Sequence, residues 1–228
     1  MKITRRQFCH AVAALSAAAL LGGCSQQGAE RAVNADGEPM FQLKLAHNMA
    51  EDHVVHIQLS AFAQEVSEKS EGSIQIQIIP NGTLGSETDM ITQIQADGLD
   101  MAKVSASTLG NFSEQFNAFS VPCVFDSQEH YYNVMDSDLV EEIYESTENG
   151  GFRGLFWLDS GARSFYTADT PIRVPSDLKG LKIRTMDSQM AIDMMKYFGG
   201  SATVMGYSDI YTGMQQGVID GAENNVTA

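Results

Sequence analysis

The sequence of 228 residues predicts an α/β fold in which open sheets are flanked by helices. Three features support this class: stretches of alternating apolar and polar residues, stretches with apolar residues at helical spacing, and short glycine-containing turns between them. Strands and helices that alternate along a chain form mostly parallel sheets, whose ligand clefts lie at the strand ends. A binding site is therefore expected at those ends.

The first half of the folded region contains three predicted strands and two predicted helices. The strands are predicted from alternating apolar and polar residues or from short apolar runs after a turn, and they span residues 41–46, 74–79 and 99–104. The helices, which have apolar residues at helical spacing, span residues 54–70 and 86–98. Ser86 followed by Asp89 is an acidic variant of the capping box, so the second helix is expected to begin there.

The second half continues the same alternation. Helices are predicted over residues 130–145, 188–198 and 208–216. Strands are predicted over residues 152–158, near Ile183, and over residues 202–205 and 218–222. The α/β pattern therefore covers both halves of the folded region.

The composition excludes several classes of function. The formal net charge is −15 and no cluster of Lys and Arg is present, so no nucleic-acid partner is expected. Cys9, Cys24 and Cys123 are too few and too scattered for a disulfide scaffold, and Cys123 is interpreted as a packed core residue. Motifs for nucleotide binding, serine hydrolysis and zinc proteolysis are absent, so neither an enzyme nor a cofactor is expected.

Residues 1–24 have the features of an export signal that ends in a lipid-attachment site. Thr4-Arg5-Arg6-Gln7-Phe8 precedes a short apolar stretch and resembles a twin-arginine signal. Leu21-Gly22-Gly23-Cys24 resembles a lipobox, so Cys24 is expected to carry acyl chains that hold the protein at a membrane. Residues 25–40 are polar and are expected to form a flexible tether. We therefore expect an exported protein in the periplasm or at the cell surface.

Three segments carry a resemblance to a known family. They are Asp177-Leu-Lys-Gly-Leu-Lys-Ile-Arg184, Tyr207-Ser-Asp-Ile-Tyr211 and Gly217-Val-Ile-Asp-Gly-Ala-Glu-Asn224. From about residue 41 onward the chain resembles the DctP-type solute-binding proteins of TRAP transporters. The resemblance implies a two-lobed, type II-like periplasmic-binding-protein fold with a ligand cleft between the lobes. Lobe I is expected over residues 41–161 and an incomplete lobe II over 162–228, because family members continue well beyond this point and the chain is expected to be truncated.

The resemblance also implies a function without catalysis. Family members bind organic acids, including C4-dicarboxylates, uronates and other sugar acids, and deliver them to the membrane permease subunits of the transporter. A sugar acid such as a uronate is the favoured ligand here, and a C4-dicarboxylate remains open. A second interpretation also remains open, in which an extracytoplasmic module senses the same acids and reports to a kinase.

The resemblance places the carboxylate-binding arginine of the family on Arg184 and a second cleft arginine on Arg163. A planar guanidinium matches a carboxylate with two parallel hydrogen bonds and keeps its charge, so this residue type suits an acid ligand. Asn224 falls on the asparagine of the family motif, and Tyr207 falls on an aromatic residue that packs over the ligand. These four residues are therefore the expected ligand contacts.

Four further residues are expected near the ligand because they adjoin a strand end or the Arg163 segment: His47, Asn48, Trp157 and Asp159. A metal site is the alternative use of the histidines in the first of these regions, because His53 and His56 lie three residues apart. The favoured interpretation is that these two histidines flank the first helix. No metal is therefore expected.

Overall fold

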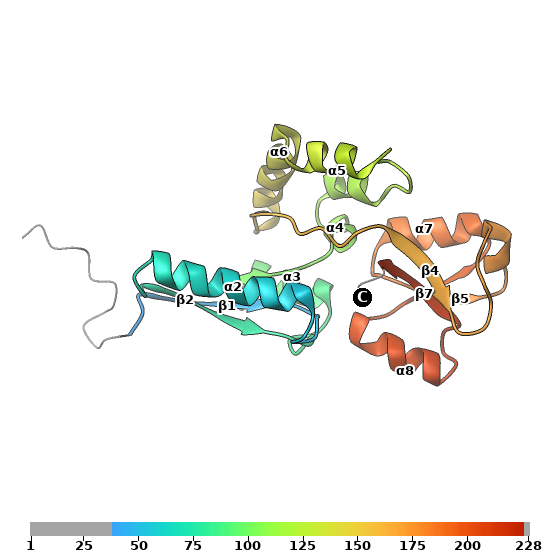
Figure 1. Cartoon of the computed structure of the whole chain (residues 1–228), viewed down its shortest axis with the longest axis horizontal. Coiled ribbons are helices and arrows are strands. Elements are labelled where there is room, and N and C mark those ends of the chain that lie inside the picture. The colour runs from blue at the N-terminus through green and yellow to red at the C-terminus, as the bar shows by residue number, and fades with distance from the viewer. Residues whose placement is uncertain (1–37, 226–228) are drawn as a thin grey trace, which may run out of the picture.

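The structure is a computed structural model that describes residues 38–225. The predicted export signal with Cys24, and most of the predicted tether, lie outside the described residues. The described strands form two sheets, one in the order β2-β1-β3 and one in the order β4-β7-β5-β6. Figure 1 shows the N-terminal sheet (β1–β3) and the C-terminal sheet (β4–β7) side by side along the long axis of the molecule.

The N-terminal sheet confirms the predicted α/β alternation. Its parallel strands are β1 (Phe41–Ala46), β2 (Ile74–Ile79) and the two-residue β3 (Met101–Ala102). Two helices, α2 (Val54–Lys69) and α3 (Glu87–Gln95), accompany it. Leu45 packs with Val55 of α2, whereas the next residue, Ala46, packs with Met90 of α3. Because successive side chains of a strand point to opposite faces, the two helices cover the two faces of this sheet.

The segment after β3 forms a helical unit. It consists of α4 (Ala106–Leu109), η1 (Glu114–Ser120), α5 (Gln128–Met135), α6 (Asp138–Ser146) and η2 (Thr147–Gly150). Phe116, Val140 and Tyr144 belong to its own small core. The predicted single helix over 130–145 is wrong, because the backbone becomes extended at Ser137, where α5 has ended and α6 begins.

Two predictions between the helical unit and the second sheet are also wrong. Residues 152–158 belong to no strand, since they have no neighbouring strand with which to form a ladder. The strand begins later, at β4 (Arg163–Thr167), where β7 (Gly221–Asn225) supplies an antiparallel partner. Cys123 is exposed rather than packed in a core, and its backbone adopts a positive φ of 57°.

The C-terminal sheet carries the second set of predicted elements. Its remaining strands are β5 (Lys182–Thr185) and β6 (Ser201–Val204), its helices are α7 (Gln189–Phe198) and α8 (Ile210–Gln215), and two short turns of helix are η3 (Pro175–Leu178) and η4 (Tyr207–Asp209). Ile183 packs with Met195 of α7, whereas Ala222 packs with Ile210 of α8. Figure 1 accordingly shows α7 and α8 on opposite sides of the sheet.

The last strand begins three residues later than predicted. A Cβ at Gly221, the first residue of β7, would collide with the carbonyl oxygen of Tyr166 on β4. Glycine therefore lets the two strands approach closely at this point. Within residues 38–225, no helix is long and apolar enough to cross a membrane.

Candidate functional site

A cleft of about 1880 Å³ lies between the two sheets and the helical unit. Typical small-molecule sites measure roughly 300–1,000 Å³, so a small ligand would fill only part of this space. The strands β1, β3, β5 and β6 all end at or next to its lining. This placement agrees with the expectation that the site of a parallel sheet lies at the strand ends. Charged and polar side chains indicate which part of the cleft is suited to a ligand.

Arg184 on β5 is the buried cation of the C-terminal wall. The residue is only 4% exposed, yet it belongs to the cleft lining. Its Nε donates a hydrogen bond to the carbonyl oxygen of Met205 at 3.0 Å, and its two terminal nitrogens donate no hydrogen bond within residues 38–225. Burial lowers the pKa of Arg184, while the carboxylate of Glu223 acts in the opposite direction. The guanidinium is thus a desolvated cation whose two terminal nitrogens can still donate hydrogen bonds.

Arg163 on β4 uses its donors within the protein. Its Nε donates to Glu223 Oε2 at 2.6 Å, its Nη1 to Asn224 Oδ1 at 2.8 Å, and its Nη2 to the carbonyl oxygen of Glu223 at 2.8 Å. Glu223 is nearly buried, whereas about a third of the Arg163 side chain (34%) remains exposed. Arg163 therefore orients Asn224 and neutralises Glu223. Arg163, Arg184 and Glu223 together carry one net positive charge.

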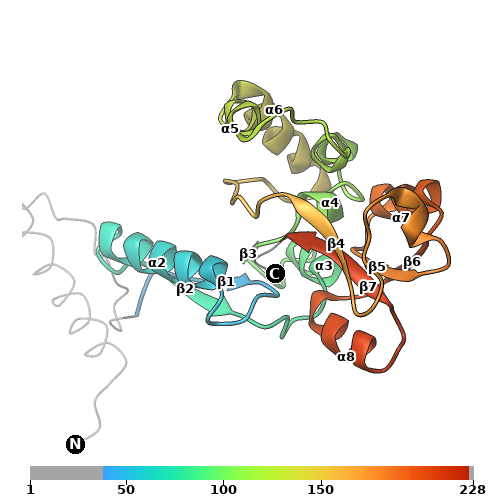
Figure 2. The ribbon, with the colours of Figure 1, turned by 45° about the vertical axis from the view of Figure 1, so that its right-hand side comes forward.

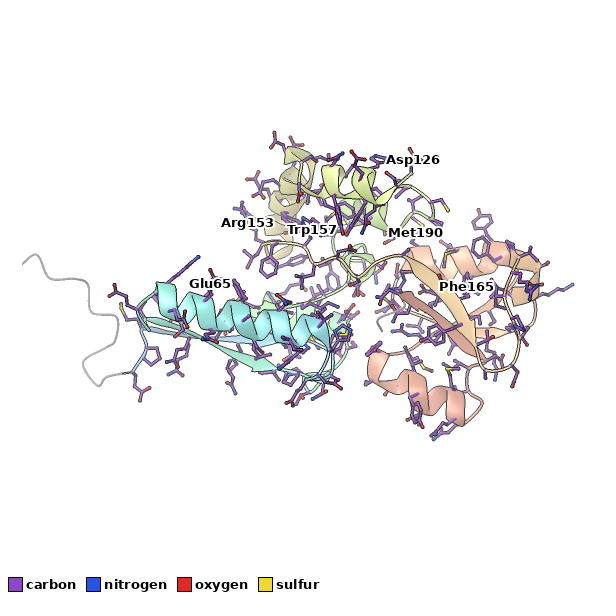
Figure 3. The ribbon with its side chains drawn as sticks, in the orientation of Figure 1. Glu65, Asp126, Arg153, Trp157, Phe165 and Met190 are labelled. Atoms are coloured by element: carbon purple, nitrogen blue, oxygen red, sulfur yellow. The ribbon has the colours of Figure 1, made fainter. Side chains whose placement is uncertain are left out.

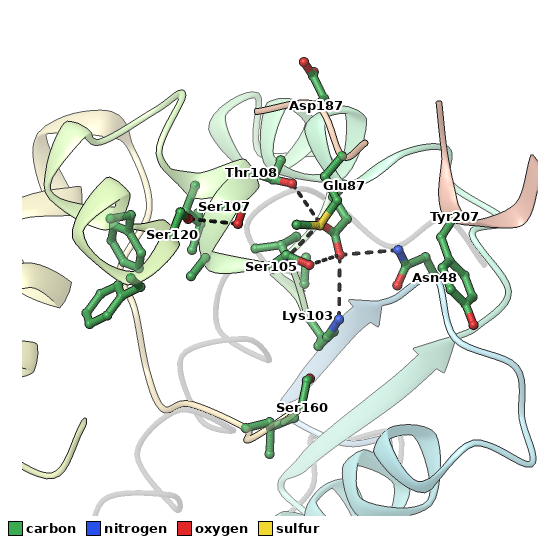
Figure 4. Close-up of a pocket in the computed structure, with 18 of the residues that line it drawn as sticks. Asn48, Glu87, Lys103, Ser105, Ser107, Thr108, Ser120, Ser160, Asp187 and Tyr207 are labelled. Atoms are coloured by element: carbon green, nitrogen blue, oxygen red, sulfur yellow. Dashed lines mark hydrogen bonds and ion pairs between the residues drawn. The ribbon is translucent and has the colours of Figure 1, made fainter. Parts of the chain in front are cut away.

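The opposite wall is organised around a buried carboxylate, Glu87, at the start of α3. Asn48 Nδ2 and the Ser105 hydroxyl donate to its Oε1 at 3.3 and 3.0 Å. The Ser105 amide and the Thr108 hydroxyl donate to its Oε2 at 3.1 and 2.9 Å. Lys103 Nζ lies 3.6 Å from Oε1. Figure 4 shows these partners converging on Glu87, which is therefore fixed in place from several sides.

Most of the residues predicted near the ligand line the cleft, namely Arg184, Arg163, Asn224, Tyr207, Asn48, Trp157 and Asp159. Trp157 lies between α6 and β4 (Figure 3), where its ring is 5.6 Å from that of Tyr131. Asp159 accepts hydrogen bonds from the Tyr132 hydroxyl and the Gly161 amide. A role of these residues in binding stays a prediction.

His47 lies beneath this surface and does not line the cleft. It is fully buried, and its Nδ1 accepts the amide hydrogen of Met49 at 3.1 Å. The proton of the neutral ring therefore lies on Nε2, which is 3.1 Å from Nδ1 of His56. Burial and the neighbouring charges of His56, Lys103 and His53 lower the pKa of His47 to about 4. The expected contact of His47 with a ligand has no support in this geometry.

The histidines of this region have structural partners. Nδ1 of His53 accepts the amide hydrogen of Val55 and caps α2. Nε2 of His56 lies 3.3 Å from the Ser60 hydroxyl. Within the described residues, no group of three or more His, Cys, Asp or Glu side chains is arranged to hold a metal ion.

Three charged residues that organise the cleft walls, Glu87, Lys103 and Glu223, were among those not expected from the sequence. Glu223 stands inside the motif that contains Asn224, so the motif itself is a signal for it. Glu87 follows the capping residue Ser86 and resembles any acidic residue in a first helical turn. Only the tertiary fold brings Lys103, after the end of β3, to this carboxylate.

The chain matches known proteins over most of its described length. The model of the DctP family, described as bacterial extracellular solute-binding protein family 7, matches residues 45–228. An uncharacterized protein of Salmonella typhimurium, YiiZ, is 41% identical over 190 residues, which are 83% of this chain and 57% of that protein. The chain thus spans less than two thirds of the length of this relative.

Solved structures agree with the sequence matches. A TRAP periplasmic solute-binding protein from Anaerococcus prevotii with bound D-glucuronate has a TM-score of 0.79 and 41% identity, over 81% of this chain and 60% of that one. A TRAP periplasmic solute-binding protein from Sulfurospirillum deleyianum with bound succinate has a TM-score of 0.77 and 25% identity, over 83% of this chain and 61% of that one. With its α/β sheets, its interposed cleft and these matches, the chain belongs to the DctP family of TRAP-transporter solute-binding proteins.

Proposed function

We propose that the protein is the extracytoplasmic receptor of a TRAP-type secondary transporter and binds an organic acid through Arg184. The observation that carries this proposal is the state of that side chain: a buried cation in the cleft wall whose terminal nitrogens have no partner within residues 38–225. A carboxylate satisfies both the charge and the donors, and the fork of the guanidinium fits its two oxygens. The function requires no catalytic step.

Asn224 and Tyr207 complete the proposed carboxylate subsite. Asn224 is held by Arg163, which leaves its amide group fixed next to the acid. Tyr207 on η4 packs partly against the core around Ile210 and also reaches the cleft. An aromatic side chain in this position covers the ligand, while the polar groups define its orientation.

The proposed mechanism is closure of two lobes over the ligand. We assign residues 41–161 to lobe I, which contains the β2-β1-β3 sheet, and residues 162–228 to lobe II, which contains the β4-β7-β5-β6 sheet. Hinge closure of such lobes buries the ligand between them, and the closed receptor then docks on the membrane subunits and delivers its cargo. Export and anchoring through Cys24 complete the proposal, since a receptor of this kind works outside the cytoplasm.

The ligand class is a hydroxylated or a simple organic acid. The Anaerococcus protein was solved with D-glucuronate and the Sulfurospirillum protein with succinate. Both ligands carry a carboxylate, so both are compatible with the Arg184 subsite. We favour the sugar acid, because the cleft offers hydroxyl-binding groups in addition to arginine.

Calorimetric titration of the purified chain with D-glucuronate and with succinate tests the proposal. Arg184→Met removes the charge but keeps an apolar stem, and it should weaken acid binding at least about 100-fold, because charge-assisted hydrogen bonds are lost. Arg173→Met is the matched control, because Arg173 is exposed and outside the cleft lining. Unchanged affinity in the Arg184 variant would refute the clamp. A cooperatively folded wild type that binds no organic acid would refute the function.

A further inference from the structure

The Glu87–Lys103 pair has an imbalance of donors and acceptors. Glu87 is saturated, because Asn48, Ser105 and Thr108 already donate to its two oxygens. Lys103 is not, because an ammonium has three N–H donors and its only partner in the described chain is Glu87, at a long 3.6 Å. The Lys103 side chain is 13% exposed and lines the cleft. Its remaining donors are therefore available to a ligand.

The charge of this pair restricts what a ligand can place there. Glu87 cancels the charge of Lys103, so the pair offers hydrogen-bond donors without a net positive charge. A second carboxylate bound to Lys103 would lie close to the Glu87 carboxylate and be repelled by it, whereas a hydroxyl oxygen would not. Asn48 Oδ1, on the residue that also contacts Glu87, accepts no hydrogen bond within residues 38–225. A hydroxyl can donate to such an acceptor and a carboxylate cannot.

A direct contact joins the wall that holds this pair to the wall that holds the carboxylate subsite. Thr88, the residue after Glu87, donates a hydrogen bond of 2.8 Å to Asp187, which stands three residues after Arg184. The Glu87 carboxylate also contributes to the electrostatic environment of Arg184. The two walls are therefore joined directly, one residue after Glu87 and three residues after Arg184, and both line the same cleft.

We propose that Glu87 and Lys103 form a hydroxyl-recognition subsite that selects a hydroxylated monocarboxylate, a sugar acid, over an unsubstituted dicarboxylate. This inference rests on the proposed function, because it assumes that Arg184 holds the carboxylate of the ligand. Lys103 donates to a ligand hydroxyl, Glu87 holds Lys103 in position, and the cancelled charge disfavours a second carboxylate. Lys103 is thus a specificity residue rather than a second anion clamp.

Two substitutions separate these roles. Lys103→Met removes the donors and leaves Glu87 with four others, so the wall keeps its structure. Glu87→Gln leaves the charge of Lys103 uncancelled. The matched control is Lys69→Met on α2, where Lys69 is 76% exposed and pairs with Glu65; neither residue lines the cleft.

Calorimetry of the full chain with D-glucuronate and with succinate gives the readout. We expect the wild type and the Lys69 variant to bind D-glucuronate at least tenfold more tightly than succinate. Lys103→Met should weaken the affinity for D-glucuronate about tenfold and change the affinity for succinate less than twofold, since only D-glucuronate loses a hydrogen bond. Glu87→Gln should strengthen the binding of succinate about tenfold, because the uncancelled charge of Lys103 then attracts its second carboxylate.

The opposite results are equally clear. Equal losses for both acids in Lys103→Met, or a wild type that prefers succinate, would overturn the subsite while leaving the Arg184 clamp intact. If Glu87→Gln unfolds, the Lys103 variant alone decides the question. A folded wild type that binds neither acid would overturn the subsite together with the proposed function.

Discussion

Thr88 and Asp187 lie 99 residues apart in the sequence, yet the Thr88 hydroxyl donates a hydrogen bond of 2.8 Å to the Asp187 carboxylate. Asn111 adds a second bond from its Nδ2 to the carbonyl oxygen of Asp187, also at 2.8 Å. Figure 2 shows the region involved, where α3 and α4 approach the C-terminal sheet. Since Thr88 adjoins Glu87 and Asp187 follows Arg184 by three residues, this bridge joins the two walls of the cleft.

The bridge predicts a loss of affinity that does not depend on the ligand. Thr88→Val removes the hydroxyl and keeps the side-chain shape, so the observed arrangement of the two walls loses one hydrogen bond of about 1 kcal/mol. We expect the Kd for D-glucuronate and for succinate to rise by the same factor, about fivefold. Thr92→Val is the control, because the Thr92 hydroxyl bonds only to the Thr88 carbonyl within α3. If Thr88→Val and Thr92→Val gave the same Kd for each ligand, a contribution of the bridge to binding would be excluded.

Elements whose signals are local could be predicted from the sequence. Apolar and polar residues alternate over the first five residues of 41–46 and of 74–79, and these segments form β1 and β2 with the predicted bounds. The capping box of α3 is present with Ser86 and Asp89 as its partners. These features depend on side chains only a few residues apart, which a linear pattern records directly.

Features that depend on distant partners could not be predicted in the same way. Residues 152–158 have the composition of a strand but find no neighbour, whereas residues 163–167 become a strand because β7 lies beside them. The same limit applies to the site: a family motif marks Arg184, but nothing local marks Lys103. Lys103 becomes a candidate only because the fold places it against Glu87.

The buried His47 predicts a loss of stability in acid. Its pKa is lowered from 6.5 to about 4 in the folded protein, so between these values only the unfolded chain takes up the proton. The free energy of unfolding therefore falls as the pH falls, by about 1.4 kcal/mol per unit and about 3 kcal/mol in all, and this contribution levels off below pH 4. Above pH 6.5 His47 contributes no pH dependence, because both states are neutral.

Urea unfolding at several pH values measures this effect. His47→Gln keeps one acceptor and one donor but does not titrate, so its stability should depend less steeply on pH between 6.5 and 4. His130→Gln is the control, since His130 on α5 has a 43% exposed side chain. A slope in the His47 variant as steep as in the wild type would contradict the prediction.

The predicted lipid anchor can be tested independently of binding. If Cys24 carries acyl chains, the exported protein should sediment with membranes and be released by detergent, because acyl chains insert into the bilayer. Cys24→Ala should move the protein to the soluble fraction, while Cys9→Ala, within the same signal, should leave it with the membranes. A Cys24 variant that still sediments with membranes would contradict lipidation at this residue.

Trp157 offers a direct optical test of the site, because it is the only tryptophan of the chain and it lines the cleft. Its ring lies 5.7 Å from that of Tyr132, whose hydroxyl donates to Asp159. A ligand in the cleft, or closure of the lobes over it, changes the polarity around this indole. We therefore expect D-glucuronate to alter the tryptophan emission along a saturation curve with the calorimetric Kd. Arg184→Met should abolish the change, whereas Arg173→Met should preserve it. Calorimetric binding without any change in emission would place the ligand away from Trp157 and remove that residue from the site.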